Sequence, residues 1–433
     1  IAAFTKQQKM RVFSWQFSHL DMEQAKELLP NCAEEDLPIT RTPDYHGEKV
    51  LPCAIDFSHP RAEELLENQW HDRMDAGFDG TMVDFGEIIP DEAVFYDGRT
   101  GDEMHNAYAL DYTKAYRKLF EKYKGEDHVL FSRSAAAGVQ KYSCQFGGDQ
   151  LSSFRGLTYA MNGGLTLAAS GFPFWGVDAG GYSGFADEET YLRWTEFATF
   201  SPIMRFHGVT PREPWAYSRY AVSVYKFYAW LRENLLKYSV HTAEEAHKTG
   251  IPMMRPLPMV FPEDKEAVYW EDEYFYGSDL LVAPVHQEGE KRRIYFPSGS
   301  WINLLDFRKM VGGNRIFQVD VPIDKIPVYI REGACILSVM NGELQLGQSM
   351  TYEKKNTVLM SRALNETSGK RYADGKEIEY NILGKTGEDF FMLRHAFETE
   401  FIVLLGFDRK PESLELNGVS LSEGASLNAL NYG

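Results

Sequence analysis

The feature of this sequence that most constrains its fold is an alternation of strands and helices over residues 1 to about 265. Short apolar runs at residues 12–17, 81–85 and 128–132 are each followed or preceded by segments with apolar residues at helical spacing. Further strands are predicted at residues 143–146, 172–178 and 253–261. Strands that are apolar throughout are typical of a parallel sheet covered by helices.

The intervening segments carry the start and stop signals of helices. A helix is predicted over residues 59–76, with Ser58 as a plausible N-cap and Gly77 as its end. Residues 106–123 predict a helix with a Tyr/Leu/Phe face that ends near Gly125. Other helices are predicted at residues 21–29, at 153–166 and, as one long helix, at 221–247.

Polar residues follow these strands, which favours a (β/α)₈ barrel. Asp84, Arg133, Asp149 and Asp178 all come after predicted strands, and in a barrel such residues point into one mouth. The structural rival is an open doubly wound sheet. The nucleotide-binding versions of that sheet are less favoured because the chain has no GxGxxG or GxxxxGK[ST] motif. Only about six barrel-like strands are found, so we expect the barrel to lack its first strands.

After about residue 265 the pattern changes to short strands separated by Gly, Pro and Asn, predicted at residues 279–285, 293–297, 301–305, 326–330, 390–393 and 401–405. Such spacing is typical of all-β domains. The predicted domains are a catalytic barrel over residues 1–265, a proximal β-sandwich over 266–350 and a distal β-sandwich over 351–433.

Composition limits the partners. The formal net charge is −18, which argues against nucleic acid, since nucleic acid would require a basic face. No apolar run approaches the roughly 18 residues that a membrane helix needs. Four cysteines are scattered without a CxxC pair, so we expect neither a disulfide framework nor a metal site. The chain begins at Ile1, so we expect that an N-terminal segment is missing and leave a signal peptide open. The sequence also leaves open whether the protein is a homo-oligomer and in which compartment it lies.

Two acidic motifs are the candidate catalytic groups. Asp84 lies at a strand end before Gly86, and Asp149 follows two glycines in a loop. Two carboxyl groups that face one cavity can divide into a nucleophile and a proton donor, as glycoside hydrolysis requires. Ordinary loop-capping roles remain the alternative for each. A proton donor at Asp149 would need an apolar side, which Phe146 and Phe154 could supply.

Other polar and aromatic side chains near these motifs are candidates for binding. Glu87 is expected to support Asp84. Arg133 could steady Asp149 or bind a hydroxyl, and Asp178 could accept hydrogen bonds from sugar hydroxyls. The remaining candidates, for which core packing or surface exposure is the alternative, are Tyr182, Arg205 and His207.

Taken together, the motifs resemble glycoside hydrolase family 31, the retaining α-glycosidases. The motifs that carry the resemblance are Asp56-Phe-Ser-His-Pro60, the Asp84 motif, Phe131-Ser-Arg-Ser134, Gly147-Gly-Asp-Gln150, Asp178-Ala-Gly-Gly181, Arg205-Phe-His-Gly208, Pro252-Met-Met-Arg-Pro256 and Val282-Ala-Pro-Val285. The resemblance implies a (β/α)₈ barrel preceded by one β-sandwich and followed by two, with no metal or organic cofactor.

The resemblance also assigns roles. It implies that Asp84 is the nucleophile and Asp149 the general acid/base, at the roughly 5–5.5 Å separation of retaining enzymes. Arg133 and His207 would contact the sugar, and Arg205 and Asp178 would line its pocket.

The Asp84-Phe-Gly-Glu87 form is similar to the α-xylosidase and sulfoquinovosidase branches. Met82 stands where relatives place a Lys or Trp that helps define the sugar, Phe146 stands where Trp is common, and Tyr182 suits a sulfoquinovosidase. The favoured prediction is a retaining exo-α-glycosidase of the α-xylosidase or α-glucosidase type. The alternatives are a sulfoquinovosidase or α-galactosidase, an α-transglycosylase, and a non-catalytic carbohydrate-binding relative or fragment that needs a partner chain.

Overall fold

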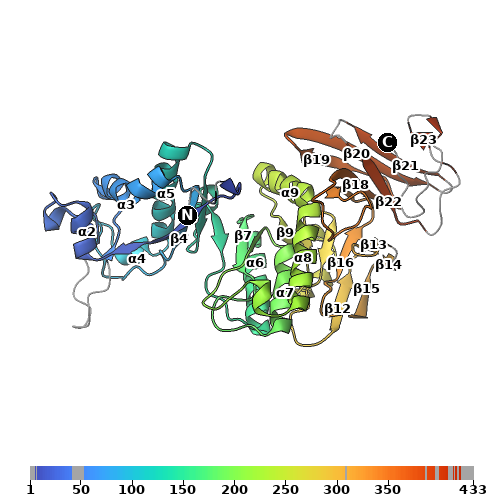
Figure 1. Ribbon diagram of the computed structural model, residues 1–433, viewed down its shortest axis with the longest axis horizontal. Coiled ribbons are helices and arrows are strands. Elements are labelled where there is room, and N and C mark those ends of the chain that lie inside the picture. Colours follow the sequence, from blue (N-terminus) through green and yellow to red (C-terminus); the bar gives the residue numbers. More distant parts are fainter. Residues whose placement is uncertain are drawn as a thin grey trace. The chain divides into compact units, whose positions relative to one another are not determined.

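The computed structural model describes residues 5, 7–40, 53–307, 310–385, 388–394, 399–407, 413, 415–416 and 419–420 (Figure 1). The chain forms two compact units, Ile1–Gly148 and Asp149–Gly433. Parallel strands with covering helices make up the first unit and begin the second, and antiparallel sheets follow. This order confirms the predicted change from an α/β to a β-sandwich architecture.

The first unit is built on a parallel sheet with the strand order β1-β4-β5-β6. Its strands are β1 (Phe13–Phe17), β4 (Gly80–Asp84), β5 (Val129–Ser132) and β6 (Cys144–Phe146). All four were predicted from the sequence. The prediction for β4 was wrong at its last residue, because Phe85 has a φ of +61° and leaves the strand conformation. β1 and β4 are in register so that Trp15 lies opposite Met82 and Phe17 opposite Asp84.

Helices α2 (Met22–Leu28), α3 (Ala62–Ala76) and α5 (Ala107–Lys124) follow the predicted ranges closely. Asp21 caps α2 in a capping box, and Gly77 ends α3 at a φ of +82°. The predicted N-cap at Ser58 was wrong, since α3 begins after Arg61. The Ser58 hydroxyl instead donates a 2.6 Å hydrogen bond to Asp56 Oδ1.

Helix α5 holds the sheet through a row of buried tyrosines at helical spacing, Tyr108, Tyr112 and Tyr116. The Tyr112 hydroxyl lies 3.1 Å from the carbonyl oxygen of Asp84 and 3.2 Å from that of Gln16. Burial raises the pKa of Tyr112 well above its usual value, so the phenol stays a donor. This contact fixes the backbone at the ends of β1 and β4.

The second unit begins with two parallel strands, β7 (Trp175–Asp178) and β8 (Ile203–Arg205). Helices α6 (Phe154–Ala169) and α7 (Glu188–Thr199) precede them in the chain. α6 is the predicted helix, whereas α7 and β8 were not predicted. α7 is buried along almost its whole length, and its polar side chains Arg193 and Glu196 form a buried ion pair instead of a solvent-facing stripe.

The predicted single helix over residues 221–247 is two helices, α8 (Arg219–Asn234) and α9 (Leu236–Thr249). The reason is Asn234, which is fully buried at the junction. Its amide donates to the carbonyl oxygen of Val339 at 2.8 Å and accepts from the backbone of Gly347 at 2.7 Å. A buried amide satisfied in this way fixes the position of the break.

The predicted strand over residues 253–261 was wrong in its extent and partners. β9 (Met254–Pro256) pairs antiparallel with β10 (Tyr274–Tyr276), and α10 (Leu257–Val260) follows it with a proline in its first turn. β9 is the last member of a sheet with the order β14-β13-β16-β11-β10-β9. Its other strands are β11 (Leu280–Val282), β13 (Ser300–Asn303), β14 (Met310–Gly312) and β16 (Val328–Arg331).

Four smaller sheets complete the described β-rich part, and the last of them is the pair β23 (Glu415–Leu416) and β24 (Val419–Ser420). β12 (Lys291–Phe296) pairs with β15 (Arg315–Asp320). β17 (Cys335–Met340), β18 (Lys355–Ser361) and β22 (Phe401–Leu405) form the second sheet, and β19 (Thr367–Ala373), β20 (Lys376–Lys385) and β21 (Glu388–Arg394) form the third. The predicted strands near residues 293–297, 390–393 and 401–405 correspond to β12, β21 and β22.

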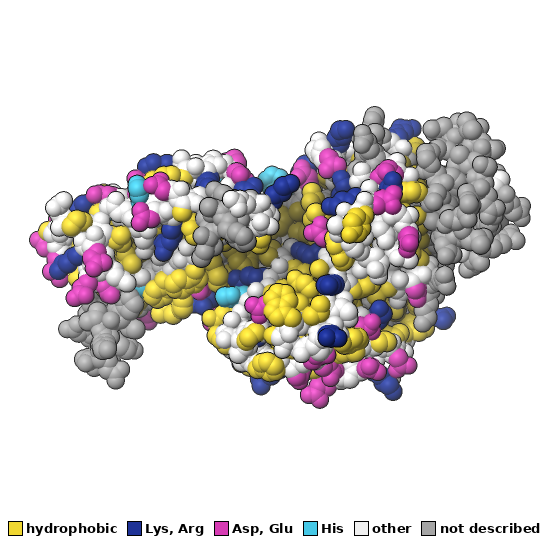
Figure 2. Space-filling view, in the orientation of Figure 1, with side chains coloured by type: hydrophobic (Ala, Val, Ile, Leu, Met, Phe, Trp, Pro, Cys, Tyr) yellow, Lys and Arg dark blue, Asp and Glu magenta, His cyan; other side chains and the backbone are white. Residues whose placement is uncertain are grey.

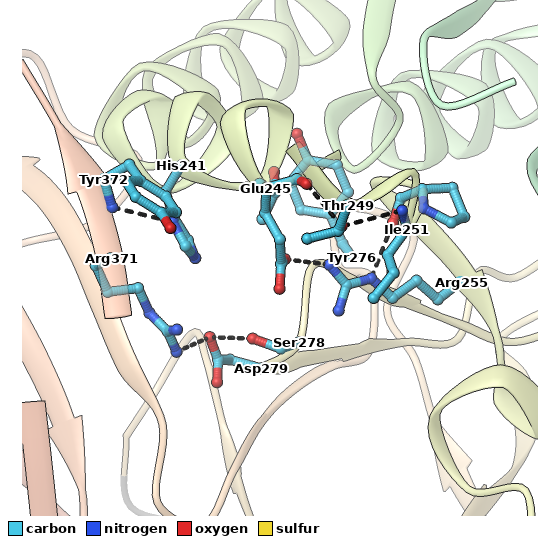
Figure 3. A network of polar contacts seen from close by, with 12 residues as sticks. His241, Glu245, Thr249, Ile251, Arg255, Tyr276, Ser278, Asp279, Arg371 and Tyr372 are labelled. Carbon is cyan, nitrogen blue, oxygen red and sulfur yellow. Dashed lines mark hydrogen bonds and ion pairs between the residues drawn. The ribbon is translucent and has the colours of Figure 1, made fainter. Parts of the chain in front are cut away.

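A polar network joins α9 to β19, and β19 to the turn between β10 and β11 (Figure 3). Arg371 on β19 donates to the buried Asp279 at 2.7 Å and to the carbonyl oxygen of Cys335 at 2.6 Å. The backbone of Tyr372 donates to His241 Nδ1 on α9 at 3.1 Å. Burial and the nearby arginines lower the pKa of His241 to about 3, so its ring is neutral and accepts this bond.

Among the described residues, no helix combines the length and apolar character that crossing a membrane requires. On the face shown in Figure 2, Lys and Arg side chains of the described part are dispersed among acidic ones. The charge is therefore mixed on this face.

Candidate active site

The carboxylate of Asp84 lies at the end of β4 and is held on both oxygens. Trp15 Nε1 donates to Oδ2 at 2.8 Å, and the backbone N–H of Phe85 donates to Oδ1 at 2.8 Å. Arg133 Nη1 lies 3.3 Å from Oδ1. Asp84 is buried, and these donors come from the middle of β1, from the residue after β5 and from its own loop. The carboxylate is therefore fixed in orientation before any ligand arrives.

The chain turns sharply after Asp84. Phe85 and Gly86 both have positive φ angles, +61° and +94°, and a positive φ at an aromatic residue is a strained conformation. The Phe85 ring compensates by packing edge-on against Phe17 at 4.6 Å between centroids and beneath the Arg133 guanidinium at 3.9 Å. The turn thus brings a cation, a ring and a carboxylate into one rigid group.

Glu87 lies three residues after Asp84 and contacts Arg133 as well. Arg133 Nη2 lies 2.6 Å from Glu87 Oε1, so one guanidinium bridges Glu87 and Asp84. The structure therefore brings together three of the predicted site residues in the first unit. Two other predicted site residues lie on strands of the same sheet: Met82 is half-buried on β4, and Phe146 is buried at the end of β6 against Phe131.

In the second unit, Asp178 at the end of β7 faces Arg205 at the end of β8. Asp178 Oδ1 and Arg205 Nη2 are 2.5 Å apart and form an ion pair. Asp178 is 1% exposed, and neither of its oxygens accepts a hydrogen bond from the described residues. Burial raises the pKa of Asp178 to about 6, although Arg205 opposes the shift.

Asp149 is the first residue of the second unit and lies in the turn before α6. Its negative charge adds to the upward shift of the Asp178 pKa. Tyr182 and His207 follow β7 and β8, and their rings lie 5.2 Å apart. The second unit therefore brings together two pairs of predicted site residues, Asp178 with Arg205 and Tyr182 with His207.

Two residues of these clusters were missed from the sequence. Trp15 contacts the carboxylate of Asp84, and its signal was the parallel register that puts it on the strand beside β4. Arg212 lies in the loop after β8 and donates to the loop after β7, and in its local sequence only the glycines that it contacts could have drawn attention to it. Among the described residues, no three His, Cys, Asp or Glu side chains form a group that could hold a metal ion.

These features define a protein with a carboxylate site at the ends of parallel strands, and comparison with known families identifies the class. Residues 1–242 match the "Glycosyl hydrolases family 31 TIM-barrel domain" and residues 250–336 the "Glycosyl hydrolase family 31 C-terminal domain". The chain belongs to glycosyl hydrolase family 31.

Relatives that are named for different activities are similar to this chain. An isomaltosyltransferase of Sporosarcina globispora is 31% identical over 82% of this chain and 34% of its own length. An α-xylosidase of Emericella nidulans is 33% identical over 65% of this chain and 37% of its own length. The cycloalternan-forming enzyme of Listeria monocytogenes, solved with a pentasaccharide substrate, superimposes with a TM-score of 0.86 over 98% of this chain and 43% of its own, at 24% identity.

The last comparison supports the fold alone. The chain spans just over a third of the length of the two curated relatives. The predicted family is confirmed, and so is the predicted TIM barrel with C-terminal β-sheets.

Proposed function

We propose that this chain is the catalytic part of a retaining exo-α-glycosidase, with Asp84 as nucleophile. The observation that carries the proposal is the orientation of the Asp84 carboxylate by Trp15, Arg133 and the Phe85 N–H. A carboxylate at the end of a parallel strand, with both oxygens held, suits in-line attack on an anomeric carbon.

In the proposed mechanism, an oxygen of Asp84 forms a bond to the anomeric carbon while the glycosidic C–O bond breaks. Asp149 gives its proton to the departing oxygen, and then takes a proton from the water that attacks the glycosyl-enzyme. Two inversions at carbon leave the sugar with its α configuration. Glu87 keeps Arg133 in place through their 2.6 Å contact and has no role in the bond changes.

The sugar would be bound by the residues of the second unit. The buried oxygens of Asp178 accept no hydrogen bond from the described residues, so sugar hydroxyls can donate to them. We propose that Arg205 and His207 contact further hydroxyls and that Tyr182 packs on the sugar face. Met82 lies two residues before Asp84 on β4, so both side chains point to the same side of the strand and Met82 can contact the sugar.

A panel of aryl α-xylosides, α-glucosides, α-galactosides and α-sulfoquinovosides tests this proposal, with Asp84→Asn as the control. We expect the wild-type protein to hydrolyse one of these glycosides and Asp84→Asn to lose that activity. Proton NMR of the first product should show the α anomer. Initial release of the β anomer, or full activity of the control, would overturn the proposal. Activity on the sulfoquinovoside alone would identify a sulfoquinovosidase, and activity on the galactoside alone an α-galactosidase. Activity on none of the substrates would favour a non-catalytic carbohydrate-binding relative.

A transfer reaction is the second candidate, because the isomaltosyltransferase is similar over 82% of this chain. In that case a sugar hydroxyl replaces water in the second step. Product analysis at rising maltose or isomaltose concentration separates the two, since a transferase forms longer oligosaccharides in preference to free sugar. We also propose that the domain boundaries lie near residues 265 and 350, which limited proteolysis can test.

A further inference from the structure

One buried guanidinium ties together the loops that carry the second unit's part of the proposed site. Arg212 is 4% exposed and lies in the loop after β8. Its Nε donates to the carbonyl oxygen of Gly181 at 2.7 Å, and its Nη2 donates to Ser152 Oγ at 2.8 Å. Its Nη1 donates to the carbonyl oxygen of Thr210 at 3.1 Å. One side chain therefore bonds to the loop after Asp149, the loop after β7 and the loop after β8.

The acceptors of this guanidinium are all neutral oxygens. Besides the three above, they are Thr210 Oγ1 and the carbonyl oxygens of Pro211, Tyr182 and Gly184. A guanidinium carries five N–H donors in a fixed planar fork, so it fixes the mutual geometry of the groups that it binds. Among the described residues no carboxylate accepts a hydrogen bond from Arg212, so its hydrogen bonds organise backbone, while its charge also opposes the upward shift of the Asp178 pKa.

Backbone hydrogen bonds continue the same connection. The N–H groups of Tyr182 and Ser183 both donate to the carbonyl oxygen of Gln150, at 2.8 and 2.9 Å, and Ser152 N–H donates to Ser183 at 2.9 Å. Gln150 is the residue directly after Asp149. The position of Asp149 is therefore coupled to the segment that carries Tyr182, and Arg212 lies against both.

Two glycines of the family motifs make room for this arrangement. A Cβ at Gly208 would lie 2.9 Å from Arg212 Cζ, and a Cβ at Gly181 would lie 2.5 Å from the Cα of Ser152. Both distances are shorter than real Cβ contacts allow. The glycines of the Asp178-Ala-Gly-Gly181 and Arg205-Phe-His-Gly208 motifs thus allow the close approach of the loops and the guanidinium.

We propose that Arg212 is a positioning residue that holds Asp149 at the distance from the bound sugar that proton transfer requires. This inference rests on the proposed function, in which Asp149 is the general acid/base. Arg212 itself contacts no reacting atom. It acts through the loop after Asp149, which it holds against the segments after β7 and β8.

Leaving-group dependence tests the proposal, with the sugar that the wild-type protein hydrolyses fastest. An alkyl α-glycoside needs a proton on its departing oxygen, whereas fluoride leaves an α-glycosyl fluoride without one. For Arg212→Ala we expect kcat/KM on the alkyl glycoside to fall about 100-fold, the effect of a misplacement of about 1 Å. On the glycosyl fluoride it should change by less than about threefold. Asp149→Ala should show the same pattern and is the positive control.

Arg232→Ala is the matched negative control. Arg232 is also a guanidinium that donates to backbone carbonyl oxygens, those of Ala198, Thr199, Ser201 and Pro202. These residues lie before β8, at the end remote from Arg205. A loss of folded protein would lower kcat/KM on both substrates by one factor, and we expect that from Arg232→Ala. An equal loss on both substrates in Arg212→Ala, or no loss on either, would overturn the proposal.

Amide hydrogen exchange gives a readout that needs no activity. The N–H groups of Tyr182 and Ser183 should exchange faster in Arg212→Ala, whereas their exchange should not change in Arg232→Ala. Unchanged exchange in Arg212→Ala would also overturn the proposal. If Arg212→Ala does not fold, Arg212→Lys and Ser152→Ala take its place, because each removes some of the donors or acceptors at unchanged backbone. If the wild-type protein hydrolyses nothing in the panel, the proposed function fails, and exchange still decides whether Arg212 orders these loops.

Discussion

The two units stabilise their site residues in opposite ways. In the first unit, side-chain donors reach the functional carboxylate itself: Trp15 and Arg133 both contact Asp84. In the described part of the second unit, Asp178 forms an ion pair with Arg205, and Arg212 donates its hydrogen bonds to loop oxygens. The first arrangement fixes one functional group, whereas the second fixes the backbone on which several groups stand. Substitutions around Asp84 in the first unit should therefore act directly on the nucleophile, whereas those around Arg212 in the second should act on the reaction through loop order.

The largest effect is expected for Asp84→Asn. The amide keeps the shape of the side chain and loses the nucleophile, so kcat should fall by about 10⁴-fold or more. The amide oxygen can still accept from Trp15, but the NH2 group then faces the Phe85 N–H and Arg133, so the midpoint of thermal unfolding should fall by only a few degrees. Steady-state kinetics and a thermal melt on the same preparation measure both quantities. A large loss of stability would show that Asp84 serves structure rather than the reaction.

The next effect concerns the stability of the second unit. Arg371→Leu leaves Asp279 buried without its partner, and such a loss costs about 3–5 kcal/mol of the free energy of unfolding. Urea denaturation measures the change. The matched control is Lys237→Ala, which removes an ion pair with the exposed Asp374 in the same junction and should cost at most about 1 kcal/mol. Equal costs for the two variants would mean that burial does not decide how much these two ion pairs contribute to stability.

A pH effect is expected from Asp178. Its pKa is about 6 in the folded protein and close to 3.8 in an unfolded chain, so the folded state keeps a proton that the unfolded state releases between these values. The free energy of unfolding should therefore fall as the pH rises from about 4 to 6, by on the order of 3 kcal/mol. Asp178→Asn should remove this part of the pH dependence.

Urea titrations of both proteins at several pH values measure the difference. Other buried acids, such as Glu273 with its pKa raised to about 8 by burial, titrate in both proteins and cancel. An identical slope in the wild-type protein and Asp178→Asn would contradict the prediction.

Arg133→Lys should have an intermediate effect on the reaction. A lysine keeps the charge but cannot bridge Asp84 and Glu87 as the planar guanidinium does, nor lie flat on the Phe85 ring. We expect kcat to fall roughly 10- to 100-fold, the range of one or two charged hydrogen bonds. Glu87→Gln, which keeps a hydrogen-bond acceptor for Arg133, should lose less. The reverse order would show that Glu87 takes part in the reaction.

The sequence was sufficient where structure depends on neighbours in the chain. The apolar runs of β1, β4, β5, β6 and β7 and the tyrosine face of α5 were all recognised. It was insufficient where distant contacts decide. The break between α8 and α9 depends on Val339 and Gly347, more than 100 residues from Asn234. Arg212 was missed because its partners are backbone carbonyl oxygens, which any residue supplies, so only the glycines around it could have drawn attention.

The smallest effect tests how far the second unit depends on close loop contacts. Gly181 and Gly184 both have positive φ angles, +75° and +89°, but a Cβ at Gly184 would meet no atom within 4 Å. Gly184→Ala should therefore cost only the strain of its conformation, about 1 kcal/mol, and leave kcat unchanged. Gly181→Ala adds a clash with Ser152 to the same strain, so it should also slow hydrolysis of alkyl glycosides more than that of glycosyl fluorides. If the two alanine variants behave alike in stability and kinetics, backbone strain alone accounts for these glycines, and the close packing of the loops is not what positions Asp149.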